Sequence, residues 1–282
     1  VDFHQVMLSN MLTQLGKHTN APINENMLRH MIIESLRSYR VKFKDEYGEL
    51  VICCDNKNYW RKKIFPYYKA KRKEDQEKSE LDWNAIYAYM AKIKQELKDN
   101  FPYPVIEVDG VEADDIIATI IKDMNLNMAN EKFLILSRDK DFIQLQKYSK
   151  VEQFDPIGGH YIKHDAPALY LKEHIIRGDR GDGIPNILSP ANALIDGIRQ
   201  KSVFEKNLAI WLKQDPSQFC DETKLARFKE NESLIDLSKI PDDIHNSIMQ
   251  EYENQQGKTR KNLMNYFMEM RLKNLMSSIG DF

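Results

Sequence analysis

Short apolar runs alternate with amphipathic stretches along the first 155 residues of the chain. Runs bounded by polar or turn residues predict buried strands, and they fall at 50–55, 103–108, 132–137 and 151–155. Between them, apolar positions recur every three or four residues, which predicts helices over 27–43, ending near Gly48, and over 83–97. Strands that alternate with helices of this length are typical of an α/β fold with a mostly parallel central sheet and flanking helices.

From about residue 165 the strand pattern fades and only helical patterns remain. We therefore expect an α/β domain at 1–164 and a smaller all-helical domain at 165–282. Within the second domain one amphipathic helix is predicted over 258–276, and its basic face is either solvated or a contact for a duplex or a partner. The core face of that helix comprises Leu263, Tyr266, Phe267, Met270 and Leu275.

Composition and charge narrow the function classes. The 282 residues carry a net charge of −2, so the chain as a whole is not a basic nucleic-acid binder. No apolar run approaches the roughly 20 residues that span a bilayer, so no membrane contact is expected. Three cysteines, with Cys53 and Cys54 adjacent, argue against disulfides and for a reducing, cytoplasmic location. The chain begins at Val1 without methionine, and we expect its first residues to end a strand that starts upstream.

Carboxylates follow four strand ends, namely the start of the chain and the runs that end near residues 55, 108 and 137. In parallel α/β sheets, sites form outside the carboxyl ends of the strands, so these acids are expected to converge. A glycine-rich loop at 177–183 adds two more acids. The nine candidate metal ligands are Asp2, Asp55, Glu112, Asp114, Asp115, Asp139, Asp141, Asp179 and Asp182.

A local explanation is open for parts of this set. Asp109 and Glu112 have the spacing of a helix capping box, and Asp114 and Asp115 would then lie in the first helical turn, where the helix dipole favours anions. The two acids of the glycine-rich loop are also compatible with a solvated turn. Such explanations treat one segment at a time and do not predict acids at all four strand ends.

Nine carboxylates at one edge of a sheet repel one another unless cations lie among them. Hard oxygen ligands without a histidine or cysteine pattern indicate Mg²⁺, with Mn²⁺ as a substitute, rather than zinc. Two such ions clamp the attacking and leaving oxygens of a phosphodiester, so phosphodiester hydrolysis is the predicted chemistry. His4, which lies near Asp2 in the sequence, is more simply explained as a packing or hydrogen-bonding residue.

A basic segment at 57–73 indicates the substrate. It holds eight lysines and arginines and no acid, with aromatic residues interleaved. Cations contact phosphates and aromatic rings stack on unpaired bases, whereas the alternative is a solvated loop whose aromatic residues pack on the core. The candidate nucleic-acid contacts are Arg61, Lys62, Lys63, Tyr67, Tyr68 and Lys71.

The order of these motifs resembles a known family. Across roughly residues 1–190, Asp2, Asp55, YYKAKR, EADD, SRDKDF and GDRGDG are similar to the 5′-nuclease superfamily of flap endonucleases and bacterial polymerase exonuclease domains. NYWRKKIFPYYK, LIDLSKIPDDI and the terminal SSIGDF are similar to the ribonucleases H of T-even bacteriophages, nearly end to end. The resemblance implies 5′→3′ exonuclease, flap endonuclease and RNase H activities that remove RNA primers and 5′ flaps in lagging-strand replication.

The same resemblance implies the parts of the enzyme. The nine acids would hold two metal ions, and Lys69 and Arg72 would act on the scissile phosphate beneath a helical arch at 57–80. DNA with a 5′ flap or a single-stranded 5′ end and RNA–DNA hybrid would be substrates of a monomer, with a sliding clamp and a single-stranded-DNA-binding protein as partners. After GDRGDGIP, Asn186 and Leu188 replace expected glycines. The helix–hairpin–helix-like region is therefore degenerate, which argues against its potassium ion.

Two other functions stay open from the residues. A PIN-like RNA endonuclease uses a related sheet, but such domains are generally shorter and lack the long basic insertion. A catalytically silent module that binds branched nucleic acid is disfavoured by acids at four strand ends, because they hinder DNA binding without a metal ion. Metal-dependent cleavage distinguishes the silent module, and a 5′ flap tested beside single-stranded RNA distinguishes the RNA endonuclease.

Overall fold

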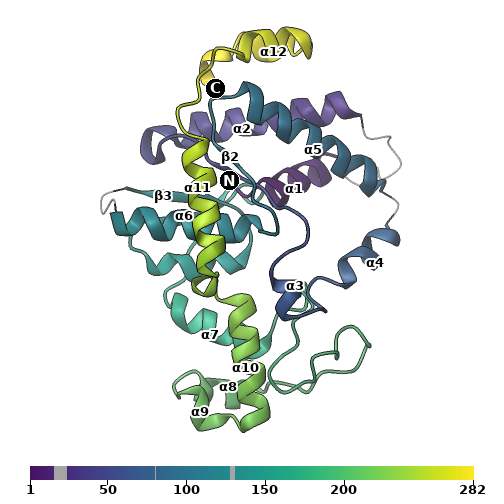
Figure 1. Ribbon diagram of the computed structural model, residues 1–282, viewed down its shortest axis with the longest axis vertical. Helices are drawn as coiled ribbons and strands as arrows, with labels where there is room; N and C mark the ends of the chain where they lie inside the picture. Colours follow the sequence, from purple (N-terminus) through teal and green to yellow (C-terminus); the bar gives the residue numbers. More distant parts are fainter. Residues whose placement is uncertain (16–23, 80, 128–130) are drawn as a thin grey trace.

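The computed structural model describes residues 1–15, 24–79, 81–127 and 131–282. Two parallel strand pairs form the centre of the molecule (Figure 1), with a fifth strand antiparallel at one edge. All four predicted strands are confirmed, whereas the fifth was not predicted because it is short and largely exposed. The strands are β1 (Ile52–Cys53), β2 (Val105–Ile106), β3 (Phe133–Leu136), β4 (Val151–Asp155) and β5 (His160–Ile162).

The first two residues lie between the two small sheets and connect them into one mostly parallel array. The backbone N–H of Cys53 donates to the carbonyl of Val1 at 2.9 Å, and that of Asp2 donates to Leu136 at 3.3 Å. Asp2 and Cys53 form a parallel bridge. Because β1 and β3 thus flank the same short segment, their carboxyl ends meet at one edge of the sheet.

Both faces of the sheet are buried. Successive side chains of a strand point to opposite faces, and here Ile52 joins one hydrophobic cluster while Cys53 joins another. Val105 and Ile106 divide between the same two clusters. The sequence reads as continuous apolar runs for this reason, as expected of a parallel sheet covered by helices.

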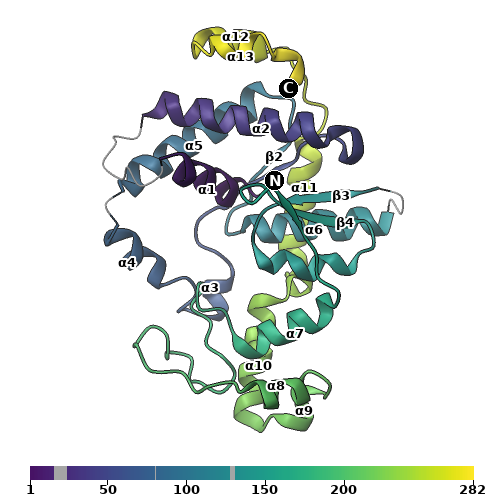
Figure 2. The same ribbon diagram turned by 180° about the vertical axis from the view of Figure 1, so that it is seen from behind.

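Helices cover both faces (Figures 1 and 2). The helix predicted to end near Gly48 is confirmed: its last residue is Tyr47, and Gly48 follows with φ of +77°. One cluster lies among α1 (Phe3–Leu15), α2 (Glu25–Tyr47) and α5 (Trp83–Asn100), whereas the other lies against α6 (Ala113–Asn127) and the 3₁₀ helix η1 (Lys140–Lys147).

After Ile162 the described residues contain helices and turns but no strand, as predicted. The boundary predicted between residues 164 and 165 does not separate the hydrophobic cores, because each of the three clusters draws side chains from both parts. The helices are α7 (Pro167–Arg177), α8 (Glu205–Trp211), α9 (Pro216–Phe219), α10 (Glu222–Ile235), α11 (Asp242–Asn254), α12 (Leu263–Glu269) and α13 (Lys273–Met276), with 3₁₀ turns η2 (Leu237–Lys239) and η3 (Ile279–Asp281).

The single helix predicted over 258–276 is wrong, because two shorter helices stand in its place. The chain between α12 and α13 turns at Arg271, whose φ of +56° is left-handed and cannot continue a right-handed helix. The turn places Leu272 in the core, where its N–H donates to the carbonyl of Phe267 at 2.9 Å. Of the predicted core face, only Met270 is not fully buried.

The basic segment forms two short helices, α3 (Arg61–Ile64) and α4 (Lys71–Glu77), joined by turns. Residues 60–69, which we call the base of the arch, pack through Phe65 and Tyr68 into the hydrophobic cluster formed by α7, α8 and α10. The views in Figures 1 and 2 agree that the loop between α7 and α8 lies beside this base. Residue 80, the last of the predicted arch, lies outside the described residues. Across the part of the chain that is described, no helix is both long and apolar enough to cross a membrane.

Candidate active site

The acids at the strand ends are brought together as predicted, and local hydrogen bonds fix two of them. Asp2 accepts from the backbone N–H of Gln5 at 3.2 Å and from the hydroxyl of Ser137 at 3.1 Å. Asp139 follows β3 and accepts from the N–H of Asp141 at 3.0 Å. Ser137 therefore links the end of β3 to the start of the chain, which places Asp2 and Asp139 side by side.

Asp55 ties the end of β1 to the start of α6. Its Oδ1 accepts from the backbone N–H of Ala113 at 2.8 Å, so the first turn of α6 is bonded by a residue far away in sequence. His4 Nδ1 accepts from the N–H of Asp55 at 3.2 Å, and burial lowers the pKa of His4. A neutral His4 thus orients the Asp55 backbone, in agreement with the hydrogen-bonding role predicted for it.

The capping box of the alternative local explanation, between Asp109 and Glu112, is not formed. Gly110, with φ of +72°, turns the chain before α6, and the N–H of Glu112 donates instead to Asp115 Oδ2 at 3.3 Å. Asp114 and Asp115 do lie in the first turn of α6, as predicted. The start of α6 is instead bonded by a distant carboxylate, because Asp55 accepts from the N–H of Ala113.

Glu112 and Asp115 have a protein cation. The guanidinium of Arg61 donates to Asp115 Oδ1 at 2.7 Å and to Glu112 Oε2 at 2.8 Å, and Trp60 Nε1 donates to Asp115 Oδ2 at 2.9 Å. Arg61 is only 3% exposed and Asp115 is fully buried. The prediction that Arg61 contacts nucleic acid is therefore corrected: it is a buried counter-ion, because two buried carboxylates require one.

A second group of contacts joins the arch to the loop after α7. Lys69 Nζ pairs with Glu112 and lies 3.5 Å from Asp182 Oδ2, and Arg72 Nη2 donates to Asp182 Oδ1 at 2.8 Å. The hydroxyl of Tyr68 lies 2.9 Å from an oxygen of each acid. Tyr68 is only 3% exposed, so the nucleic-acid contact predicted for it is also corrected to a structural role.

The other predicted nucleic-acid contacts are accessible to a substrate, since Lys62, Lys63 and Tyr67 are exposed and Lys71 is half-buried.

Among the described residues, four of the other carboxylates make no ion pair with a lysine or an arginine. Burial, with Asp55 and Asp139 nearby, raises the pKa of Asp2 to about 7. Burial and the charge of Asp139 raise the pKa of Asp141 to about 8. Burial and the charges of Asp139 and Asp2 also raise the pKa of Asp114. We call Asp2, Asp114, Asp139 and Asp141 the cation-poor cluster. Neighbouring carboxylates without a lysine or arginine partner fit a hard divalent ion.

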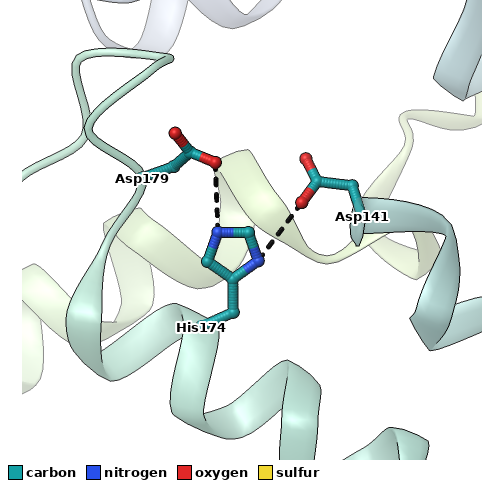
Figure 3. Close-up of side chains that lie close together, drawn as sticks. All are labelled: Asp141, His174 and Asp179. Atoms are coloured by element: carbon teal, nitrogen blue, oxygen red, sulfur yellow. Dashed lines mark hydrogen bonds and ion pairs between the residues drawn. The ribbon is translucent and has the colours of Figure 1, made fainter. Parts of the chain in front are cut away.

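His174 was not predicted as a site residue, yet it lies between two of the acids (Figure 3). Its Nδ1 is 3.2 Å from Asp141 Oδ1 and its Nε2 is 3.1 Å from Asp179 Oδ2. Burial opposes a proton on the ring, but the bond to Asp179 and the charge of Asp141 outweigh it and raise the pKa of His174. The sequence signal was the spacing, since His174 stands one helical turn before the Gly178–Asp179 pair.

The two acids of the loop after α7, Asp179 and Asp182, point in different directions. Gly178, with φ of +68°, ends α7, and a side-chain carbon there would lie 2.4 Å from the carbonyl oxygen of Ile184. The tight return lets Asp179 Oδ1 accept the N–H of Asp182 at 3.0 Å. Burial raises the pKa of Asp179, but His174 and this N–H outweigh it and hold that pKa below its usual value. Asp179 thus faces His174, whereas Asp182 faces the arch.

The divergent stretch after this loop is braced by a side chain. Asn186 Nδ2 donates to the carbonyl of Lys201 at 2.8 Å, and its Oδ1 accepts from the N–H of Leu188 at 3.0 Å. The hydroxyl of Ser189 adds a bond at 2.9 Å. Asn186 therefore fills the position expected for glycine with its own hydrogen bonds, and residues 186–204 form turns rather than a helix.

Comparison with known proteins places the chain in a family. A model described as "5'-3' exonuclease, N-terminal resolvase-like domain" matches residues 2–174, and one described as "T4 RNase H, C terminal" matches residues 166–282. Ribonuclease H of Enterobacteria phage T4 is 32% identical over 293 residues, which cover 100% of this chain and 94% of that protein. The chain belongs to the 5′-3′ exonuclease family. It is therefore a nuclease that hydrolyses phosphodiester bonds.

Further relatives agree with this family. The 5'-3' exonuclease of Buchnera aphidicola is 28% identical over 216 residues, which cover 67% of this chain and 71% of that protein. The fold matches the bacteriophage T5 D15 flap endonuclease in a complex with DNA and metal ions, with a TM-score of 0.62. That match has 16% identity and covers 88% of this chain and 95% of the T5 chain. At this identity the T5 protein shows the fold alone, which is the α/β sheet with a helical carboxyl-terminal part.

Proposed function

We propose that this nuclease is a Mg²⁺-dependent, structure-specific enzyme with 5′→3′ exonuclease, flap endonuclease and RNase H activities. The observation that carries the proposal is the position of the cation-poor cluster directly beside the base of the arch. Burial and the charges of Asp139 and Asp2 raise the pKa of Asp114, and the nearby charge of Lys69 opposes this rise in part. A phosphodiester placed there would meet both the oxygen ligands for metal ions and the cations of the arch.

The proposed ion ligands are the cation-poor cluster together with Asp55. When bound, two divalent ions would supply the activation of water and the stabilisation of the leaving oxygen. Glu112, Asp115 and Asp182 already pair with Arg61, Lys69 and Arg72, so we assign them to holding the arch rather than to ligating an ion. Their assignment narrows the set of nine acids predicted from the sequence.

Lys69 and Arg72 are the proposed catalytic cations. Their charge stabilises a phosphate most strongly as negative charge builds in the transition state. Arg72 is 53% exposed and pairs with one carboxylate, so it can reach a substrate without leaving a buried position. Lys62, Lys63, Tyr67 and Lys71 would track the single-stranded 5′ end by phosphate contact and base stacking.

The biological role proposed for the enzyme follows from its relatedness to the phage T4 ribonuclease H. We infer that it removes RNA primers and 5′ flaps during replication in the host cytoplasm. DNA with a 5′ flap and RNA–DNA hybrid are the proposed substrates. A sliding clamp and a single-stranded-DNA-binding protein are proposed partners.

Product mapping tests this function. A 5′-flap DNA labelled at either end is incubated with the protein in Mg²⁺ or in EDTA, beside single-stranded RNA and an RNA–DNA hybrid. The expected result is Mg²⁺-dependent release of short 5′ products and of a product cut near the flap junction, with the hybrid also degraded. Cleavage of single-stranded RNA alone would indicate the PIN-like alternative, and tight flap binding without cleavage would indicate a silent module. Either outcome would overturn the proposal.

A further inference from the structure

The group formed by Asp141, His174 and Asp179 joins an acid of the nuclease sheet to two residues of the helical part (Figure 3). One ligand atom from each residue lies within 4.8 Å of the others. Asp139, Asp141, His174 and Asp179 all line one small surface pocket, so the group is open to solvent ions. This inference rests on the proposed function, since it concerns the same metal centre, but it adds a ligand that the carboxylates alone do not supply.

The spacing of the atoms matches ligation. Two ligand atoms that each lie about 2.1 Å from one ion, at right angles, are about 3.0 Å apart. Asp141 Oδ1 and His174 Nδ1 are 3.2 Å apart, so a single ion could bind both after a small movement. The ring of Tyr170 packs edge-on against the imidazole with 6.1 Å between centroids, which restricts the orientation of His174.

The two carboxylates beside His174 are not equivalent. Both oxygens of Asp179 are engaged, since Oδ1 accepts from the N–H of Asp182 at 3.0 Å and Oδ2 faces His174 Nε2 at 3.1 Å. For Asp141, the second oxygen has no hydrogen bond to any residue in the described part of the chain. Histidine ligands of metal ions commonly donate their other ring N–H to a carboxylate, which fixes the tautomer and the ring. Asp179 occupies that position.

We propose that one divalent ion of this centre is held by Asp141 and by Nδ1 of His174, with Asp179 as the positioning residue on Nε2. Imidazole nitrogen binds first-row transition ions in preference to Mg²⁺. The centre therefore binds Mn²⁺ more tightly, relative to Mg²⁺, than an all-carboxylate site would. Asp139, adjacent through the N–H of Asp141, supplies a further oxygen.

Pulsed electron paramagnetic resonance on the full chain tests the ligand directly. Protein labelled with ¹⁵N-histidine is loaded with Mn²⁺, and the spectrum is searched for a nitrogen coupling of a directly bound imidazole. The expected result is a coupling in wild type and in His160→Gln, an exposed control, and no coupling in His174→Gln. Mn²⁺ bound without nitrogen coupling in wild type would overturn the inference while leaving the proposed nuclease centre intact. No bound Mn²⁺ at all would overturn both.

Affinity measurements by calorimetry separate a ligand from a simple counter-charge. His174→Gln is expected to lose about tenfold or more in Mn²⁺ affinity and much less in Mg²⁺ affinity. His174→Lys keeps a positive charge but lacks the imidazole, so it should not restore Mn²⁺ binding. Equal losses for both ions in His174→Gln, or wild-type Mn²⁺ affinity in His174→Lys, would contradict the proposal. The wild-type spectrum decides the question if the variants do not fold.

Discussion

Arg61 and Asp115 form a two-pronged ion pair in the interior, with Nη2 to Oδ1 at 2.7 Å and Nη1 to Oδ2 at 2.9 Å. The pair joins the base of the arch to the first turn of the helix that also carries Asp114. The acids of this region therefore fall into two groups, one neutralised by the arch and one without a lysine or arginine partner among the described residues.

Removal of Arg61 is expected to destabilise the protein strongly. Arg61→Ala would leave Asp115 buried without a counter-ion and Glu112 with Lys69 as its remaining cation, and removal of one partner of a buried pair typically costs about 3–5 kcal/mol. The free energy of unfolding from urea titration measures the loss. Lys62→Ala, at the exposed neighbouring position, should change that free energy by less than about 0.5 kcal/mol. Equal effects of the two substitutions would mean that the buried ion pair does not hold the arch.

Stability in EDTA should fall as the pH rises. The pKa of Asp141 is raised by burial and by Asp139 from 3.8 to about 8, so folding favours its protonated form. Its contribution to stability is fully present below about pH 4 and is lost as the pH rises through about 8. Melting temperatures of the metal-free protein across this range measure the slope. Asp141→Asn should flatten the slope and raise the melting temperature near pH 8, whereas Asp165→Asn, on the surface, should not.

Asp182→Asn should have the opposite effect. Asp182 accepts from Arg72 and lies near Lys69, so loss of its charge removes the carboxylate that pairs with Arg72 and leaves Lys69 paired with Glu112 alone. We expect a lower melting temperature in EDTA than for wild type, measured beside Asp141→Asn. Mg²⁺ should stabilise Asp141→Asn less than it stabilises wild type, because a damaged site gains less from a ligand of the folded state. Stabilisation by both substitutions in EDTA would show that the acids do not divide into two groups.

Truncation of the arch cations should slow cleavage. Arg72→Ala is expected to lower the single-turnover rate on a 5′-flap substrate by about a hundredfold, the typical cost of removing one transition-state contact. Lys69→Ala should do the same and also destabilise the fold, since Lys69 partly neutralises buried Glu112. Lys201→Ala and Lys213→Ala serve as exposed controls. Similar rates for all four variants would reduce the arch to a solvated loop.

The sequence predicted features that depend on local periodicity or on strand order. The end of α2 near Gly48 and the convergence of Asp2, Asp55, Asp114 and Asp139 at one edge of the sheet are of this kind. Both follow from rules that act along a strand or helix. The proposed metal site was accessible to sequence reasoning for the same reason.

Features that depend on distant partners could not be predicted in this way. Nothing in the basic run distinguishes Arg61, which is buried on two carboxylates, from Lys62, which is exposed. The bond from the N–H of Ala113 to Asp55 spans 58 residues, so the local pattern around Asp109 and Glu112 could not show which carboxylate bonds the start of α6. His174 was missed because its partner Asp141 lies on another element. Tertiary packing, rather than propensity, decided each case.

Flap cleavage by Asp114→Asn and Asp139→Asn tests the central claim most directly. Both residues belong to the cation-poor cluster, so loss of a carboxylate should weaken the ion that activates the reaction and leave the arch intact. The single-turnover rate with Mg²⁺ is measured beside flap binding by fluorescence anisotropy on the same protein samples. We predict a loss of about a thousandfold in rate with nearly unchanged binding. Rates within about tenfold of wild type for both variants would contradict the assignment of the metal centre.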